Sequence, residues 1–406
     1  MSHLLADATR PHTDATPVPE LIRALTDPKG FGDATLRTPR ADAIELLGGI
    51  PDPDLLPGAQ LADAYAAALA EPGLPALQYG RTEGVPELRE WIAAREAVPV
   101  SRILITNGGF HGLALAIQLV LERGDLVAVD NPIFPLFLRG LELADARILP
   151  IRVGADGLDL DELEARLAAG ARPAALYTVP DFHNPSQGVL PESARRHLVA
   201  LAERYGFIVF ADNPYREIAF DGVTESVAAF NESDHVVHIN TFTKTLGPGL
   251  RLGWVVLPER FTANAVKLRS RNDSHSSQLT QHAIARFVTS HETAFDEVLQ
   301  RARPVYAERA AALAAALERE APGEFEVRPP RGGFFVWARL RDDAIDEARL
   351  AADASLEGIE YQRGAFFTSG EGTDADRHLR LGFSRASVAE LDEAARRLAA
   401  AIARQR

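Results

Sequence analysis

A lysine among threonines, followed seven residues later by an arginine, is the part of this sequence best suited to chemistry. The segment Thr241–Arg251 reads TFTKTLGPGLR. The amine of Lys244 could hold an aldehyde as an imine. The hydroxyls of Thr241 and Thr243 and a guanidinium could bind a phosphate beside it. Taken alone, the segment is equally typical of an exposed polar turn, so the rest of the sequence must decide.

Composition excludes several classes of protein. The chain has 406 residues, 46% of them apolar and 25% charged, which indicates a globular protein of two or three packed units. The net charge of −14 argues against a general affinity for nucleic acid or anionic membranes. The absence of cysteine excludes disulfides, thiolate catalysis and zinc–sulfur sites. The N-terminus lacks the apolar core of a signal peptide, and no apolar run approaches the roughly 20 residues that span a bilayer. We therefore expect a cytoplasmic protein with no metal site.

Short apolar segments alternate with helical ones through the first two thirds of the chain. Strands are predicted at Ile103–Thr106, Asp125–Asp130, Arg147–Ile151, Ala174–Val179, Ile208–Ala211, His235–Thr241 and Gly253–Leu257. Helices are predicted between them near Phe110–Glu122, Pro135–Leu143 and Glu192–Tyr205. This alternation predicts a mostly parallel sheet covered on both faces, with ligands at the strand ends.

The remaining segments predict a second, smaller α+β unit. A long helix near Thr293–Glu318, with Pro304 as a possible kink, connects the two units. Strands then follow at Phe325–Val327, Gly333–Arg339, Ile359–Tyr361 and His378–Phe383, with helices near Ile345–Leu356 and Ser387–Arg404. The first forty residues read as an arm with a short helix near Pro19–Thr26. We expect residues 1–58 to form the arm and part of the small domain, 59–295 the large domain, and 296–406 the C-terminal small domain.

Four further clusters lie at strand ends or within strands. The glycines of Thr106–Gly109 free backbone N–H groups to face an anion at a helix N-terminus. His183–Gly188 contains an Asn-Pro turn, and Asp212–Tyr215 begins with a carboxylate that needs a cationic partner if buried. Arg380, inside an apolar strand, is costly unless it meets a carboxylate. Taken alone, each cluster also has a purely structural interpretation. The glycine and Asn-Pro segments could be routine turns, Asp212 could cap a loop, and Arg380 could lie on the solvated face of a strand.

The order and spacing of these clusters resemble the fold-type-I enzymes that use pyridoxal 5'-phosphate (PLP), and among them the class I/II aminotransferases. The segments Gly48–Pro53 (GGIPDP) and Leu77–Gly80 (LQYG) are typical of the subgroup of aminoadipate, kynurenine and broad-specificity aromatic or branched-chain aminotransferases. The resemblance extends from about Leu21 to the end of the chain. It implies an α/β large domain with a mostly parallel sheet between helices. A smaller α+β domain would be built from the C-terminal segment and the N-terminal arm.

The resemblance also assigns roles in catalysis and cofactor binding. Lys244 would form the internal aldimine and then move the proton between Cα and C4′. Asp212 would pair with the protonated pyridine nitrogen, and Tyr215 and Asn184 would hydrogen-bond the phenolic oxygen of the ring. An aromatic residue, here Phe134, would stack on the ring, although ordinary core packing explains it equally well. The phosphate would be bound by Arg251, Thr241, Thr243 and the backbone of Gly108, Gly109 and Phe110.

Substrate recognition and assembly follow from the same resemblance. Arg380 would grip the substrate α-carboxylate, with Asn184 and a backbone amide of Gly49 beside it. Arg23 would meet a distal carboxylate, or else be a solvated helix residue. Tyr79 would reach the phosphate of a neighbouring subunit, which implies a homodimer with shared sites. The implied reaction is ping-pong transfer of an amino group from an L-amino acid to a 2-oxoacid.

The sequence departs from the family pattern at one place. Relatives usually carry Ser-Gln or a similar polar pair where this chain has Gly109 and Phe110, so a hydroxyl donor to the phosphate is lost. One neutral hydrogen bond contributes only about 0.5–1.5 kcal/mol, so cofactor binding should survive. The change leaves open another reaction at Cα, such as elimination, decarboxylation or oxidation. An effector-sensing domain of a transcription regulator and a catalytically idle scaffold are further alternatives.

Overall fold

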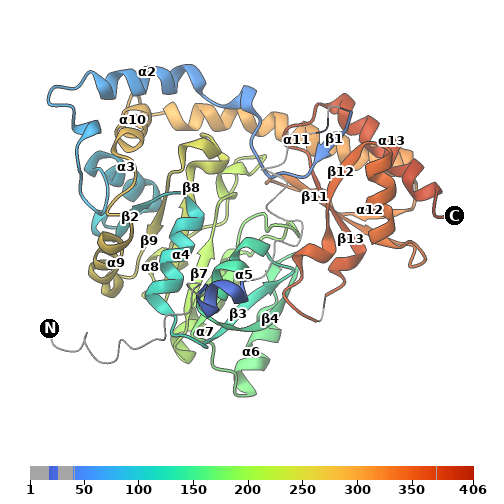
Figure 1. Cartoon of the computed structure of the whole chain (residues 1–406), viewed down its shortest axis with the longest axis horizontal. Coiled ribbons are helices and arrows are strands. Elements are labelled where there is room, and N and C mark those ends of the chain that lie inside the picture. Colours follow the sequence, from blue (N-terminus) through green and yellow to red (C-terminus); the bar gives the residue numbers. More distant parts are fainter. Residues whose placement is uncertain (1–17, 26–39, 41, 372) are drawn as a thin grey trace, which may run out of the picture.

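The computed structural model describes residues 18–25, 40, 42–371 and 373–406. Its largest element is an eight-stranded sheet with the strand order β2-β9-β8-β7-β6-β3-β4-β5 (Figure 1). The strands are β2 (Ile103–Thr106), β3 (Leu126–Asn131), β4 (Arg147–Gly154), β5 (Gly157–Leu158), β6 (Ala175–Thr178), β7 (Ile208–Asp212), β8 (Val236–Thr241) and β9 (Gly253–Val256).

The central strands of this sheet run parallel. β4, β3, β6, β7 and β8 pair in parallel, whereas β9 and β2 continue the sheet antiparallel on one side and β5 on the other. The predicted mostly parallel sheet is confirmed. Because parallel strands all end at the same edge, the residues that follow β3, β6, β7 and β8 are gathered there.

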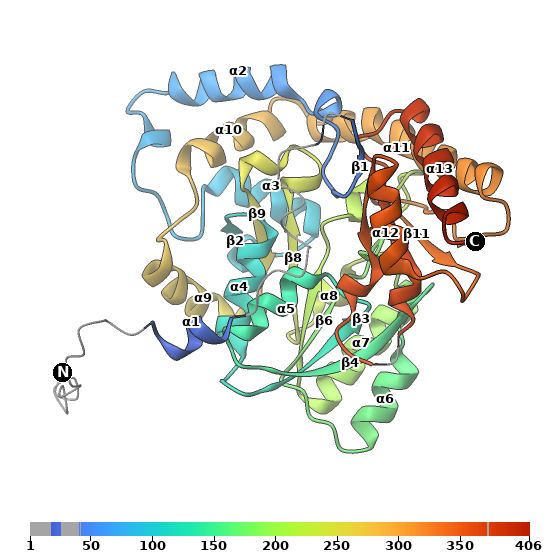
Figure 2. The same ribbon diagram turned by 45° about the vertical axis from the view of Figure 1, so that its right-hand side comes forward.

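Alternate residues of the strands face opposite layers of helices. Tyr177 and Phe210 belong to the cluster that includes α4 (Gly109–Val120) and α5 (Pro135–Glu142). Their strand neighbours Leu176 and Val209 pack instead with α6 (Leu160–Ala168) and α7 (Glu192–Tyr205), on the other face (Figure 2). This period of two, with both sets buried, explains why the strands read as continuous apolar runs.

At the β2–β9 end of the sheet, α3 (Pro86–Glu96) and α10 (Gln278–Val288) cover one face, and α2 (Gly58–Leu69) packs on α10. Helix α9 (Glu259–Asn272) lies beside α4 on the opposite face. Neither α9 nor α10 was predicted from the sequence. Helix α9 buries only Ala265 and Arg269, so it lacks the apolar periodicity by which a helix is recognised.

The C-terminal third forms a five-stranded sheet, in the order β1-β12-β13-β11-β10. Its strands are β1 (Ile44–Leu46), β10 (Phe325–Val327), β11 (Phe335–Leu340), β12 (Ile359–Arg363) and β13 (His378–Gly382), and its helices are α12 (Glu347–Leu356) and α13 (Val388–Ala403). The long helix α11 (Ala294–Glu320) runs from beside α10 to α13 and connects the two sheets (Figure 1). β1 pairs with β12, so an N-terminal segment completes the small sheet. The domain boundaries predicted above stay a prediction.

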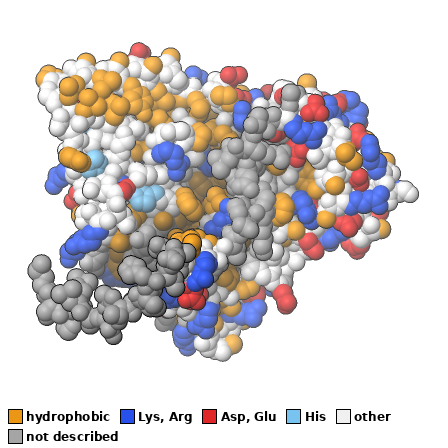
Figure 3. Space-filling view, viewed as in Figure 1, with side chains coloured by type: hydrophobic (Ala, Val, Ile, Leu, Met, Phe, Trp, Pro, Cys, Tyr) orange, Lys and Arg blue, Asp and Glu red, His pale blue; other side chains and the backbone are white. Residues whose placement is uncertain are grey.

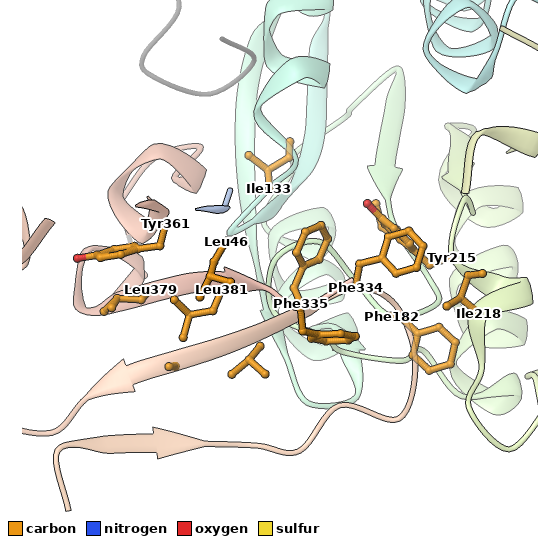
Figure 4. Close-up of a cluster of buried hydrophobic side chains, with 14 of the residues drawn as sticks. Leu46, Ile133, Phe182, Tyr215, Ile218, Phe334, Phe335, Tyr361, Leu379 and Leu381 are labelled. Atoms are coloured by element: carbon orange, nitrogen blue, oxygen red, sulfur yellow. The ribbon is translucent and has the colours of Figure 1, made fainter. Parts of the chain in front are cut away.

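Aromatic side chains join the two sheets next to the strand ends. Figure 4 shows Phe334 and Phe335, from the small sheet, beside Tyr215, which follows β7. The ring of Tyr215 meets each phenylalanine edge-on, with centroids 5.9 Å apart. Gly49 packs so closely on the same cluster that a Cβ there would lie 2.3 Å from Cζ of Phe335. This junction fixes the small sheet against the edge of the large one.

Among the described residues, no helix is both long and apolar enough to cross a bilayer, and no group of three or more acidic or histidine side chains is arranged to hold a metal ion. The cytoplasmic location expected from the sequence stays a prediction.

Candidate active site

A cavity of about 140 Å³ opens at the carboxyl edge of the large sheet. It brings together residues that are more than a hundred positions apart in the sequence. Ten of the predicted site residues line it: Gly109, Phe110, Phe134, Asn184, Asp212, Tyr215, Thr241, Thr243, Lys244 and Arg251.

One side of the cavity is built from the turn before α4 and the segments on either side of β9. Thr106 and Thr241, the last residues of β2 and β8, both pair with Gly253, so β9 holds these two strand ends together. The turn between β2 and α4 closes on Arg251: Gly108 has a φ of +84°, and a Cβ there would lie 2.8 Å from Nη2 of Arg251. Only glycine fits both the conformation and the space.

Polar groups on this side fit a phosphate. Oγ1 of Thr241 lies 2.8 Å from Oγ1 of Thr243 and accepts the backbone N–H of Thr243. Arg251 donates to the carbonyl of Asn107 at 3.0 Å, which holds its guanidinium against the turn. Helix α4 begins at Gly109, and the free N–H groups of a helix N-terminus attract anions.

Lys244 lies in the short turn after β8, with its amine inside the molecule. Nζ donates to the carbonyl of Gly49 at 2.8 Å and lies 5.5 Å from the centroid of the Tyr215 ring. Burial, reinforced by the charges of Arg380 and Arg251, lowers the pKa of Lys244 to about 8, although Asp212 opposes the shift. A substantial fraction of the amine is therefore neutral near physiological pH, as a nucleophile or base requires.

Asp212 is a buried carboxylate at the end of β7. Its Oδ2 accepts a hydrogen bond from the phenol of Tyr177 at 3.0 Å, the only side-chain donor to it among the described residues. Burial raises the pKa of Asp212 to about 7, while Tyr177 and Lys244 lower it. A cationic partner in the cavity would stabilise the ionised form.

Asn184, which lines the cavity, connects the two sheets. Its Oδ1 accepts from Nη1 of Arg380 at 2.9 Å, and its side chain also bonds Tyr215. Arg380 lies on β13, with its guanidinium 4.0 Å from the ring centroid of Phe335 and 4.9 Å from that of Phe367. Burial lowers the pKa of Arg380 to about 9, so the site favours an anion beside it.

The remaining predicted site residues do not line the cavity. Gly108, Gly49 and Arg380 do not line the cavity but contact residues that do. Tyr79 is 95% exposed, against the edge of His275. Arg23 is exposed on the short helix α1 (Glu20–Ala24), and most of the arm around it lies outside the described residues.

Some residues of the site were not predicted from the sequence. Leu113, Val179 and Pro214 also line the cavity, and Tyr177 contacts Asp212 from behind. The signal for Tyr177 was a phenol inside an otherwise apolar strand, next to the strand that ends in a carboxylate. Apolar lining residues such as Leu113 carry no comparable signal.

These groups fit a phosphorylated aromatic aldehyde. Lys244 supplies an amine of lowered pKa, and Asp212 supplies a carboxylate with one oxygen outside the hydrogen bond to Tyr177. The glycine turn, the threonines and Arg251 supply donors for a phosphate.

Comparison with known proteins agrees with this geometry. The family model for aminotransferase class I and II matches residues 52–398. The chain belongs to this family. A 2-aminoadipate transaminase of Thermus thermophilus is 33% identical over 371 residues, which cover 90% of this chain and 91% of that protein.

Two solved structures are similar along most of their length. The α-aminoadipate aminotransferase LysN of Thermus thermophilus, complexed with N-(5'-phosphopyridoxyl)-L-leucine, has a TM-score of 0.82 and 31% identity, covering 92% of this chain and 97% of that one. The kynurenine aminotransferase of Pyrococcus horikoshii has a TM-score of 0.82 and 29% identity, covering 90% and 91%. These matches confirm the resemblance, the fold class, the assignment as a transaminase, and PLP as the cofactor.

The pKa of Lys244 is directly testable in the cofactor-free protein. We expect its acylation by an amine-directed reagent to be half-maximal near pH 8. Because Asp212 raises the pKa of Lys244, Asp212→Asn should move this midpoint to lower pH. Mass spectrometry resolves the sites easily, since the chain has lysine only at positions 29, 244 and 267.

Lys267, exposed on α9, is the internal reference for reagent reactivity. A midpoint for Lys244 at the ordinary lysine value of about 10.4 would contradict the electrostatic account of the site.

Proposed function

We propose that the enzyme moves the amino group of an L-amino acid to a 2-oxoacid in two ping-pong half-reactions. The observation that carries this proposal is Lys244, an amine with a pKa of about 8 in the same cavity as the buried carboxylate of Asp212. PLP, when bound, withdraws electrons from the Cα bond that is broken. The protein has to hold it, orient the substrate and move one proton.

Lys244 is proposed as the catalytic residue. Its neutral amine would hold the cofactor and, once released, would take a proton from Cα and return it at C4′. Asp212 would balance the charge of the protonated ring nitrogen, which would keep the ring an electron acceptor. Tyr215 and Asn184 are proposed to bind the phenolic oxygen of the ring, since their side chains are already hydrogen-bonded to each other. Phe134, which lines the cavity, is proposed to stack on the ring.

The phosphate and the substrate carboxylate are assigned to separate cations. Arg251, Thr241, Thr243 and the backbone of residues 108–110 are proposed to bind the phosphate. Arg380 is proposed to bind the α-carboxylate, with Asn184 beside it, because the buried guanidinium gains most from an anion. Gly49 is proposed to add its backbone amide. Arg23 is proposed to meet a distal carboxylate of dicarboxylic substrates.

A screen of amino acids against 2-oxoacids tests the reaction. We expect amino-group exchange, with 2-oxoglutarate or pyruvate among the acceptors, and its loss in Lys244→Ala. Release of ammonia, CO₂ or peroxide without exchange would instead support another reaction at Cα. Borohydride reduction of the working enzyme should fix a pyridoxyl group on Lys244, which mass spectrometry detects.

The same screen tests Arg23. If Arg23 binds the distal carboxylate, Arg23→Ala should lower kcat/KM for glutamate about 10-fold and leave leucine unchanged, because one charge-assisted contact is lost. The matched control is Arg204→Ala, another exposed helical arginine. Unchanged glutamate kinetics would remove Arg23 from the site.

We further propose that two copies of the chain form a dimer with shared sites. Hydrophobic side chains gather on the surface over α2 and the segment after it (Figure 3). Leu69, Leu74 and Leu77 are 43%, 42% and 58% exposed there, and Tyr79 follows at 95%. A contiguous exposed apolar patch of this kind is typical of a protein interface. Tyr79 is proposed to cross that interface to the phosphate of the partner's cofactor.

A hybrid dimer tests this sharing. Lys244→Ala and Tyr79→Ala chains are tagged differently, co-expressed and purified together. If Tyr79 serves the partner's site, the hybrid contains one intact site and should show about half the activity of the wild-type dimer, whereas both parents are impaired. If Tyr79 serves its own subunit, no site in the hybrid is intact and activity should not return.

The missing hydroxyl at Gly109 gives a further test of the phosphate site. A Cβ at this position would lie 3.5 Å from Cβ of Thr241, an ordinary contact, so a serine fits without strain. Gly109→Ser should therefore add one donor and tighten PLP binding about 2- to 10-fold, measured by equilibrium dialysis. Gly109→Ala fills the same space without a hydroxyl and is the matched control. Equal tightening by both variants would contradict a phosphate contact at this position.

A further inference from the structure

One polar group beside the site has no role in the proposed function: the phenol of Tyr177. It lies on β6, fully buried, and donates to Oδ2 of Asp212 at 3.0 Å. Its ring stacks on Phe137 of α5, with centroids 3.8 Å apart and an angle of 10° between the planes. A neutral hydroxyl placed this deeply is costly to bury unless it is hydrogen-bonded, and its partner here is the carboxylate.

The sheet itself sets this contact. Tyr177 pairs with Phe210 across the β6–β7 ladder, and Asp212 lies two residues further along β7, on the same face. Tyr177 is therefore the diagonal neighbour of the carboxylate, within reach of a long side chain. Stacking on Phe137 prevents the phenol from turning away.

The charges around Asp212 make this hydrogen bond consequential. Burial raises the pKa of Asp212 to about 7; the Tyr177 hydrogen bond and Lys244 lower it, and Asp130 of β3 raises it. Oδ2 of Asp130 in turn lies 3.1 Å from Nε2 of His183, which is also buried. Burial keeps the pKa of Tyr177 far above its ordinary value, so the phenol stays a neutral donor. The ionised and neutral forms of the Asp212 carboxyl group are thus close in free energy near pH 7.

We propose that Tyr177 is a positioning residue for the cofactor: it stabilises Asp212 as a carboxylate and engages Oδ2, which leaves Oδ1 for the ring nitrogen. This inference rests on the proposed function. It means that Tyr177, through Asp212, makes the site prefer a cofactor ring that carries a protonated nitrogen. Without the phenol, Oδ2 would be buried with no donor. The proton would then reside on Asp212, and the ring nitrogen would lose its anionic partner.

Cofactor binding, measured without turnover, tests this role. The full-length chain is stripped of cofactor and titrated with two ligands: PLP, and the analogue in which carbon replaces the ring nitrogen. Wild type is compared with Tyr177→Phe and with the control Tyr306→Phe. Tyr306 is equally buried, but its hydroxyl accepts a hydrogen bond from the backbone N–H of Asp52, which is not one of the proposed cofactor-binding residues.

In Tyr177→Phe we expect PLP to bind about 10-fold more weakly and the carbon analogue to bind within about 2-fold of wild type, because only PLP needs an ionised Asp212. Tyr306→Phe should bind both ligands as wild type does. Equal weakening of both ligands in Tyr177→Phe would mean a merely structural role and overturn the inference, as would unchanged PLP affinity.

A second variant keeps the test independent of folding defects. In an Asp212→Asn background, Tyr177→Phe should have no further effect on the preference for PLP over the analogue, and a persistent effect would overturn the inference. Wild-type protein that fails to bind PLP would instead contradict the proposed function itself. The two failures are therefore distinguishable.

Discussion

The burial of a carboxylate at the end of β7 is the constraint on which this site depends. Asp212 lies where water is largely excluded, and an isolated charge there is expensive. Within the described residues it is compensated by the amine of Lys244 and the phenol of Tyr177. The pairing is incomplete, so burial raises the pKa of Asp212 to about 7, and a cationic ring bound beside it would lower this pKa again.

The same electrostatics determine the reactivity of the lysine. Two arginines face Lys244 and lower the pKa of its amine, and each is suited to an anion. A phosphate beside Arg251 and a carboxylate beside Arg380 would reduce this repulsion in turn. Arrival of cofactor and then of substrate would therefore raise the basicity of the amine at the stage when it has to accept a proton. Binding and catalysis would then be coupled through charge.

The sequence predicts which residues line the cavity where chemistry restricts the residue type. An amine that holds a phosphorylated aldehyde needs phosphate donors near it, which made Thr241, Thr243 and Arg251 recognisable. Parallel strands bring Asp212 and Asn184 to the same edge. Tyr177 was not recognisable, because a tyrosine in a buried strand is ordinarily a core residue, and only the strand register reveals its contact with Asp212. Helix α9 was missed because its surface is mostly polar. Tyr79 acts on a partner in the proposed assembly, so a single chain shows it only as an exposed side chain.

The departure at Gly109 bears on binding more than on the choice of reaction. Gly109 contacts Thr241, among the phosphate donors, and Phe110 is 45% exposed at the rim of the cavity. The loss of one neutral hydrogen bond, about 0.5–1.5 kcal/mol, is smaller than the roughly 1.5–3 kcal/mol of a hydrogen bond between charged groups, such as Arg251 could donate to a phosphate. In the proposed mechanism the reaction at Cα depends instead on Lys244 and on Arg380, which is held by Asn184 and by the aromatic junction of the two sheets. The altered turn contains none of those groups, so it gives no reason to expect a reaction other than transamination.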